Sequence, residues 1–238
     1  VIYNAIKSQQ ANARVYFSLD NNWNQGNDNK LIYTARATLD AAAAAFSAHG
    51  NIDWGLAYHA YPVPSVEPEF WDDAATGQVT NNISTTKVIN FANLSLLTDY
   101  MQKPAMLDRS GKVRHIILSE VGFSSQSQTR GSVEKEQAAA FAYAYYIADS
   151  NPYIDAFILT RQIDAPGETK SGLALGLWTT NVKEGEALKP YSAKYIWDVF
   201  KHIDDKKTSL QYTEFAKKII GINKWSDVIP NFRLRSME

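Results

Sequence analysis

The segment Arg114-His-Ile-Ile-Leu-Ser-Glu-Val-Gly-Phe123 decides the fold class, because it leads from a short apolar run directly into a carboxylate. The aliphatic residues 116–118 predict a buried β-strand, and Gly122 predicts that the chain turns out of it. Glu120 then lies at the carboxyl end of the strand, where α/β-barrel enzymes carry their catalytic groups. Because Ile116, Leu118 and Glu120 share one strand parity, we expect the face that packs the barrel interior to carry Glu120 to its mouth. The alternative is that Glu120 only caps a helix or pairs with a surface cation.

Strand patterns alternate with helical patterns on both sides of this segment. The predicted strands begin near residues 14, 54, 114 and 154, and each interval between them holds one predicted helix. This order is typical of βα units with right-handed crossovers, which build a parallel sheet. The expected strands cover 14–20, 53–61, 114–120 and 154–161, a polar loop covers 21–29, and the expected helices cover 1–11, 31–48, 90–103, 132–149, 190–203 and 209–220.

The chain length indicates a barrel, although the number of units does not complete one. Its 238 residues are close to the ~250 of a whole (β/α)₈ barrel, but only four units are visible, because their strand-to-helix loops are long. We therefore expect an α/β fold of the TIM-barrel type with about four βα units, which make either half a barrel or an open parallel sheet. Residues 1–205 are expected to form this domain, and 206–238 a helical tail packed on it.

Composition and charge exclude several classes of protein. A formal net charge of −1 without a Lys/Arg-rich run gives no case for nucleic acid or an anionic membrane as a partner. No apolar run reaches the length of a membrane span. The chain has no cysteine, and only His59 is expected at a strand end, so neither a disulfide nor a metal site is expected. No glycine-rich phosphate-binding pattern occurs, so we expect no nucleotide cofactor. The cellular compartment stays open.

Four motifs in order resemble one family of barrel enzymes. Ser119-Glu120-Val-Gly-Phe123 looks like the seventh-strand motif of the retaining glycoside hydrolases of clan A, and Tyr58-His59-Ala60-Tyr61-Pro62 resembles their sixth-strand motif. Leu159-Thr-Arg-Gln-Ile-Asp164, with Leu173-Ala-Leu-Gly-Leu-Trp178 after it, resembles the eighth-strand region of a bacterial family of glycosidase-like proteins. Arg14-Val-Tyr-Phe-Ser-Leu-Asp20-Asn-Asn-Trp23 fits the fifth strand of that family. The similarity covers about residues 1–205, and its specificity comes from the order of the motifs.

This resemblance implies a carbohydrate substrate and the role of each half of the barrel. Glu120 corresponds to the nucleophile, and the present chain corresponds to strands five to eight, the carboxyl-terminal half. Retaining hydrolysis needs two carboxylates about 5–5.5 Å apart, and in clan A the general acid/base follows strand four, before the region that this chain resembles. Val1 also begins inside a predicted helix without an initiator methionine. We therefore expect the acid/base in a missing amino-terminal half-barrel, with that half or a second copy of the chain as partner.

Asp20, His59 and Tyr61 are the candidates to assist Glu120. His59 and Tyr61 alternate onto one face at a strand end, where they could orient the nucleophile, and a tyrosine hydroxyl that donates to a carboxylate favours its charged form. The alternative for His59 is an ordinary core histidine. Asp20 could bind a sugar hydroxyl, or it could simply form the turn before Asn21-Asn22.

The remaining candidates are substrate contacts. Arg161 and Asp164 are expected either to pair with each other or to bind substrate at the rim of the site. The tryptophans in the strand-end loops are expected to stack on sugar rings, whereas Trp54 and Trp197 are expected in the core. The loop tryptophans are Trp23, Trp71 and Trp178.

One other function fits the same residues. A non-catalytic carbohydrate-binding barrel, or an inactive relic of a glycosidase, keeps the fold and the aromatic loops but needs no second carboxylate. The enzyme and the binding protein therefore differ in whether another carboxylate faces Glu120 across the mouth of the barrel.

Overall fold

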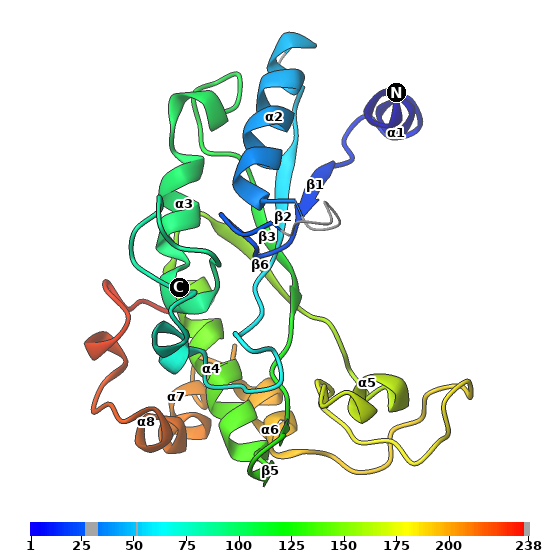
Figure 1. The fold of residues 1–238 in the computed structure, drawn as a ribbon, viewed down its shortest axis with the longest axis vertical. Helices are drawn as coiled ribbons and strands as arrows, with labels where there is room; N and C mark the ends of the chain where they lie inside the picture. The colour runs from blue at the N-terminus through cyan, green and yellow to red at the C-terminus, as the bar shows by residue number, and fades with distance from the viewer. Residues whose placement is uncertain (27–32, 51, 236–238) are drawn as a thin grey trace.

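The chain is an α/β protein built on one four-stranded parallel sheet. A computed structural model describes residues 1–26, 33–50 and 52–235 (Figure 1). The strands lie in the order β1-β2-β3-β6, and neighbouring strands are parallel, which confirms the predicted parallel α/β arrangement. Part of the predicted polar loop and the first two residues of the predicted helix 31–48 lie outside the described residues. The strands are β1 Tyr16–Leu19, β2 Gly55–His59, β3 Ile116–Val121 and β6 Ile154–Leu159.

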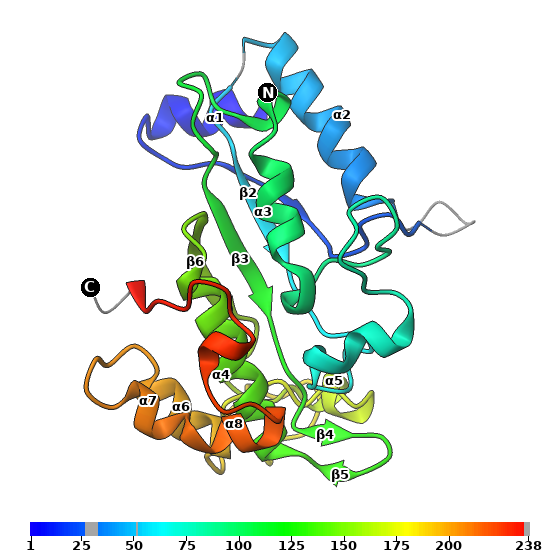
Figure 2. The ribbon, with the colours of Figure 1, turned by 90° about the vertical axis from the view of Figure 1, so that its left-hand side faces the viewer.

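Three helices cover one face of this sheet. Figures 1 and 2 show α2, α3 and α4 on the same side of the strands, whereas α1 and α5 lie on the other side. The helix α4 is apolar around most of its circumference, as expected of a helix enclosed between a sheet and other elements. These helices are α2 Ala35–Ala48, α3 Ser95–Met101 and α4 Glu134–Ser150, and on the opposite side are α1 Ile2–Gln9 and α5 Pro166–Lys170.

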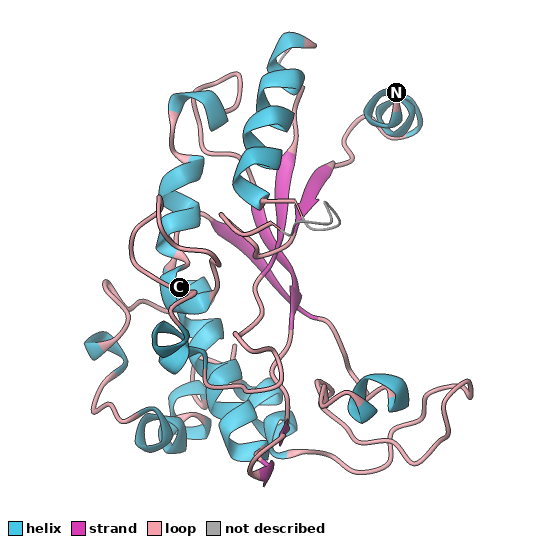
Figure 3. Ribbon diagram, in the orientation of Figure 1, coloured by secondary structure: helices cyan, strands magenta, loops and turns pink. Residues whose placement is uncertain are grey.

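The remaining elements lie in the loops and in the carboxyl-terminal region (Figure 3). The predicted helix 209–220 is divided at Thr213, and Trp225 of the tail packs its ring edge-on against Tyr146 of α4, at 4.8 Å between centroids. No described helix is long and apolar enough to span a membrane. These elements are α6 Tyr195–His202, α7 Ser209–Tyr212, α8 Glu214–Ile220, the hairpin strands β4 Gln126–Ser127 and β5 Gly131–Ser132, and the 3₁₀ helices η1 Phe70–Thr76, η2 Phe91–Asn93, η3 Pro104–Met106 and η4 Trp225–Asp227.

The core lies between the sheet and these helices, and it corrects the predicted strand parity. Ile116 and Leu118 are fully buried, and they pair with Leu56 and Tyr58 of β2. The Tyr58 hydroxyl in turn donates to the backbone carbonyl just before η2, on the helical side. The expectation that Ile116 and Leu118 face a barrel interior is therefore wrong, because the helices supply the larger apolar surface and the strand turns its aliphatic side chains toward it.

An irregularity in β3 places Glu120 on the opposite face. Leu118 pairs with Tyr58, but the next residue of β2, His59, pairs with Glu120, so that β3 has one residue more than β2 at this point. Such a β-bulge changes the side to which the following side chain points. Glu120 consequently shares the uncovered face with His59, at the predicted edge of the sheet, although Ile116 and Leu118 point to the opposite face.

The second face of the sheet has no helical layer in the part of the chain that the structure describes. Ile117 and Ala156 pair on this face, and Ile158 is 46% exposed. Phe157 and Leu159, which were expected to line this face with Ile116 and Leu118, pack against the core instead. The ring of Phe157, for example, contacts that of Phe141 in α4, at 5.9 Å between centroids.

Candidate functional site

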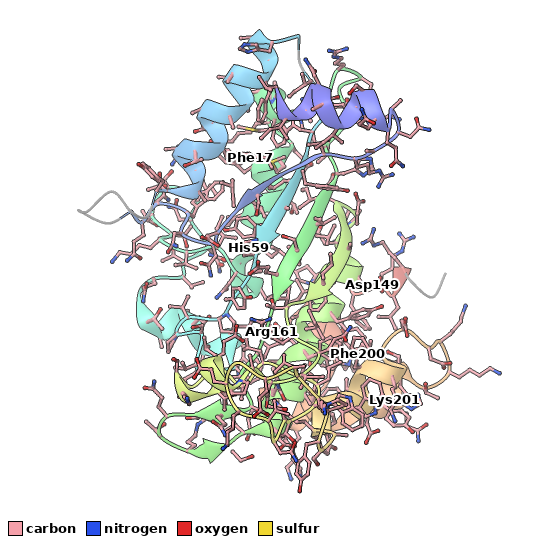
Figure 4. All side chains as sticks on the ribbon, turned by 90° about the vertical axis from the view of Figure 1, so that its right-hand side faces the viewer. Phe17, His59, Asp149, Arg161, Phe200 and Lys201 are labelled. Carbon is pink, nitrogen blue, oxygen red and sulfur yellow. The ribbon has the colours of Figure 1, made fainter. Side chains whose placement is uncertain are left out.

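The carboxyl ends of the first three strands bring together three of the predicted site residues. Asp20 directly follows β1, His59 ends β2, and Glu120 lies near the end of β3. Because the strands are parallel and adjacent, these ends meet at one edge of the sheet. Figure 4 looks onto the uncovered face and shows His59 there, above Arg161. The location agrees with the general position of active sites in parallel α/β folds.

His59 is held between carboxylates. Its Nδ1 lies 2.7 Å from Oδ1 of Asp20, and its Nε2 lies 3.1 Å from the Ser18 hydroxyl and 3.8 Å from Oε1 of Glu120. A carboxylate acceptor at Nδ1 selects the tautomer that carries its proton there. Nε2 of the neutral ring then accepts from Ser18 and faces Glu120. Asp20, expected as a substrate contact or a turn former, is thus the orienting partner of His59.

Tyr61 connects Glu120 to the last strand. Its hydroxyl donates to Oε2 of Glu120 over 3.2 Å and shares a hydrogen bond of 2.6 Å with the Thr160 hydroxyl. Burial is the largest influence on the pKa of Tyr61, and the hydrogen bond with Thr160, which lowers it, is the second. Together with the nearby Glu120 charge, burial raises this pKa to about 12. The hydroxyl therefore keeps its proton at neutral pH and can donate to Glu120 as predicted.

A cleft of about 790 Å³ opens beside this group. Its volume lies within the range of small-molecule sites. Both Ser119 and Glu120 contribute to it, because the bulge directs the two side chains to the same side of β3. The other lining residues come from the end of β6 and from the segments that follow β1, β2 and β6, and they include Asn21, Asn22, Tyr61, Val63, Pro64, Ser65, Gln78, Ile158, Leu159, Thr160, Arg161, Glu168, Leu173 and Leu175.

Arg161 lines the cleft, but its partner is not the predicted one. Its Nε donates to Oε2 of Glu168 over 2.8 Å, and its terminal nitrogen donates to the other oxygen of the same carboxylate. Asp164 points away from the cleft and forms a buried ion pair with Lys194, at 2.7 Å. The expectation of an Arg161–Asp164 pair, or of Asp164 as a rim contact, is therefore wrong, since the short helix α5 places Glu168 next to the guanidinium.

The predicted tryptophan contacts are also corrected. Trp23 is fully buried and packs edge-on against Tyr100, at 4.9 Å between centroids, so its ring cannot stack on a ligand. Trp71 packs on Phe70 in η1. Trp178 is half-buried against Trp197, and it does not line the cleft. Large apolar rings are more stable when they are buried, so these tryptophans pack against other aromatic side chains.

Sequence reasoning missed Glu168, Thr160, Ser18 and Lys194. The first lies in a segment read as loop, although Pro166 followed by an acidic residue in the next turn is a helix-start signal. The hydroxyl residues carry no local signal, because their partners are about 40 and 100 residues away along the chain. Among the described residues, no group of three or more histidine, cysteine or acidic side chains could hold a metal ion.

Comparison with known proteins gives one match. A family model described as a family of unknown function, DUF5722, matches residues 1–228. No curated protein and no solved structure matches this chain. Because the family model extends over nearly the whole sequence, the chain belongs to the DUF5722 family of unknown function.

Proposed function

We propose that this protein acts on carbohydrate as a retaining glycoside hydrolase with Glu120 as the nucleophile. The observation that carries the proposal is the setting of Glu120: a carboxylate at the carboxyl edge of a parallel sheet, bonded to Tyr61 and facing His59 beside a cleft. A single oriented carboxylate in such a cleft is what nucleophilic attack on a sugar requires.

The proposed reaction has two steps. An oxygen of Glu120 attacks the anomeric carbon, and the bond to the leaving-group oxygen breaks while a general acid donates a proton to that oxygen. Water then attacks the same carbon and releases Glu120, and the former acid takes the proton from the water. Tyr61 orients Oε2 through its hydrogen bond, so that Oε1, which faces His59, is the oxygen directed to the substrate.

The general acid is a second carboxylate. Glu168 lines the cleft, but both of its oxygens accept hydrogen bonds from Arg161. We therefore propose that the acid comes from polypeptide that covers the open face of the sheet. In this arrangement the four strands are one half of a (β/α)₈ barrel, and an upstream half-barrel or a second copy of the chain supplies the other half.

The second candidate function is carbohydrate binding without hydrolysis. The ion pair between Arg161 and Glu168 favours it, because that pair leaves Glu120 as the only carboxylate among the described lining residues of the cleft that is not paired with an arginine or lysine. A binding protein would use the cleft and its polar lining in the same way, but it would form no glycosyl-enzyme.

Covalent labelling separates the two functions. A panel of 2-deoxy-2-fluoro-glycosides with activated leaving groups should add one sugar to the wild-type protein, and peptide mass spectrometry should locate it on Glu120. Glu120→Gln should abolish the adduct, whereas Glu186→Gln, at an exposed glutamate that does not line the cleft, should retain it. Equal labelling of the Glu120→Gln variant would remove Glu120 from the role. Binding to a glycan array without any labelling would support the binding protein.

A further inference from the structure

Arg161 is the only cation among the described residues that line the cleft. It follows the carboxyl end of β6, close enough to Glu120 and Tyr61 for the three charges or dipoles to interact. A guanidinium in such a place is the usual means of binding an anionic sugar, since its planar donors match a carboxylate or a sulfate. Whether Arg161 can bind an anionic sugar depends on the group with which it already pairs.

Arg161 already forms an ion pair with Glu168 of the same chain. The pair is bidentate, with one bond of 2.8 Å from Nε and a second bond from a terminal nitrogen to the other carboxylate oxygen. The side chains of Arg161 and Glu168 are 38% and 31% exposed, so solvent screens them only in part. The hydrogen bonding that Arg161 donates to Glu168 is also the main reason why the pKa of Arg161 is raised.

The position of Glu168 is fixed by local structure. It lies in the first turn of α5, where Pro166 starts the helix. Its backbone carbonyl also accepts from Leu173, so the segment folds back on itself beside the cleft. The local structure of α5 therefore holds Glu168 in the wall of the cleft.

The charged residues that line the cleft do not favour the binding of an anionic ligand. Glu120 and Glu168 face one guanidinium, which leaves one net negative charge among the described lining residues, and Asp20 adds another carboxylate next to His59. The rest of the lining offers neutral amides and hydroxyls, which suit the hydroxyl groups of a sugar. These neutral polar residues include Asn21, Asn22, Ser65, Gln78 and Thr160.

We propose that the cleft takes uncharged glycans, and that Glu168 is the residue that excludes uronic acids and sulfated sugars by neutralising Arg161. The inference rests on the proposed carbohydrate function and adds the substrate class to it. An acidic sugar would have to displace Glu168 from Arg161, or meet an excess of carboxylates without an unpaired cation in the described lining. An uncharged sugar meets neither cost.

The test compares matched oligosaccharides that differ at the sixth carbon. Binding to gluco-, galacto- and manno-oligosaccharides and to the corresponding oligouronates is measured by calorimetry with wild-type Glu120 in place, and Glu120→Gln replaces it only for a sugar that is turned over. We expect the neutral member of the bound pair to be preferred about tenfold or more, as one charge interaction of this kind allows. Adding Glu168→Gln, which leaves Arg161 with an unbalanced charge, should reduce or reverse that ratio, and the gain for the uronate should fade as salt is added.

Glu184→Gln is the matched control. Glu184 pairs at 2.7 Å with Lys170 of α5, the helix that also carries Glu168. Both side chains are largely exposed, outside the cleft. The control removes the same unit of charge and should leave the neutral-to-uronate ratio unchanged. A wild-type cleft that prefers the uronate, or a ratio that Glu168→Gln does not alter, would overturn the inference while the carbohydrate function stands. Failure to bind any member of the panel would instead count against the proposed function itself.

Discussion

Glu120 reaches the cleft through one extra residue in β3. Ile116 and Leu118 point to the helices, and a regular strand would send Glu120 in the same direction, into the core. The bulge opposite His59 reverses that direction. The cost of burying a charged carboxylate among aliphatic side chains is large, and the irregular pairing avoids it.

Asp20 determines which nitrogen of His59 carries the proton. We expect the wild-type ring, when neutral, to hold its proton on Nδ1, because Asp20 accepts from that atom at 2.7 Å. Asp20→Ala removes the acceptor and should shift the proton toward Nε2, which long-range ¹⁵N–¹H spectra of the histidine side chains detect. Asp155→Ala is the control, since Asp155 pairs with His115 elsewhere. An unchanged His59 pattern in Asp20→Ala would show that Asp20 does not position the ring.

Asp73 makes the stability of the cleft wall depend on pH. It is buried in η1, and one oxygen accepts from the backbone of Val63, which lines the cleft, and from the amide of Asn90. Burial is the main cause that raises its pKa from 3.8 to about 7, against the opposing effect of these hydrogen bonds. As the pH rises, the Asp73 carboxyl therefore loses its proton at a lower pH in the unfolded chain than in the folded state.

We expect the contribution of Asp73 to stability to be greatest below pH 4 and to be lost between about pH 4 and 7. The loss is about 4 kcal/mol, as a shift of this size implies. Asp73→Asn keeps an acceptor oxygen but cannot ionise, so its free energy of unfolding, measured with urea at pH 5 and 8, should fall less than that of the wild type. The exposed Asp204, which lies outside η1, provides the control variant Asp204→Asn. Parallel pH profiles of wild type and Asp73→Asn would contradict this assignment.

The segment between β6 and α6 is held by one buried cation. Lys194 is buried at the start of α6, and it donates to Asp164, to the Ser125 hydroxyl and to the carbonyl of Ala174. Burial, only partly offset by Asp164, lowers the pKa of Lys194. These bonds connect three chain segments behind Leu173 and Leu175, which line the cleft.

Lys194→Met should destabilise the fold by about 3–5 kcal/mol, because it leaves the carboxylate of Asp164 buried without its ion pair. The double variant Asp164→Asn with Lys194→Met should recover part of this loss, since no buried charge remains. Urea denaturation followed by tryptophan fluorescence measures both. Lys201→Met provides the control, because Lys201 pairs with Asp198 on the exposed side of α6. A loss below about 1 kcal/mol for Lys194→Met would show that the pair contributes little.

At the scale of the whole molecule, the described part of the chain leaves one face of the sheet without a helical layer and both edge strands without a further partner. Within the described residues, β1 pairs only with β2 and β6 only with β3. The face away from the helices carries Ile158, which is 46% exposed, and α1 buries none of its residues. Parallel sheets in water are normally covered on both faces, because their strands expose too much apolar surface otherwise.

We therefore expect this 238-residue chain to self-associate, as a half-barrel that pairs with a second copy would. Sedimentation analysis should show a concentration-dependent species larger than the monomer. Ile158→Lys should shift the equilibrium toward monomer, whereas Leu188→Lys, at an exposed apolar residue of a distant loop, should not. A soluble monomer with a cooperative unfolding transition would contradict the proposed half-barrel.

The sequence by itself determined the alternation of four parallel strands with helices, and it placed Asp20, His59 and Glu120 at one edge of the sheet. Both follow from local patterns: apolar runs predict strands, and the residues after parallel strands gather at the same edge. The link from Tyr61 to Glu120 was also visible, because both lie at strand ends.

Only the tertiary structure decided the partners and the directions of the side chains. The choice of Glu168 over Asp164 for Arg161 depends on a short helix, and the burial of Trp23 depends on Tyr100, far along the chain. The bulge that turns Glu120 outward depends on the register between two strands, which no local pattern contains. Pairing energies of this kind arise from contacts between distant segments, and they exist only once the sheet and its helices have packed together.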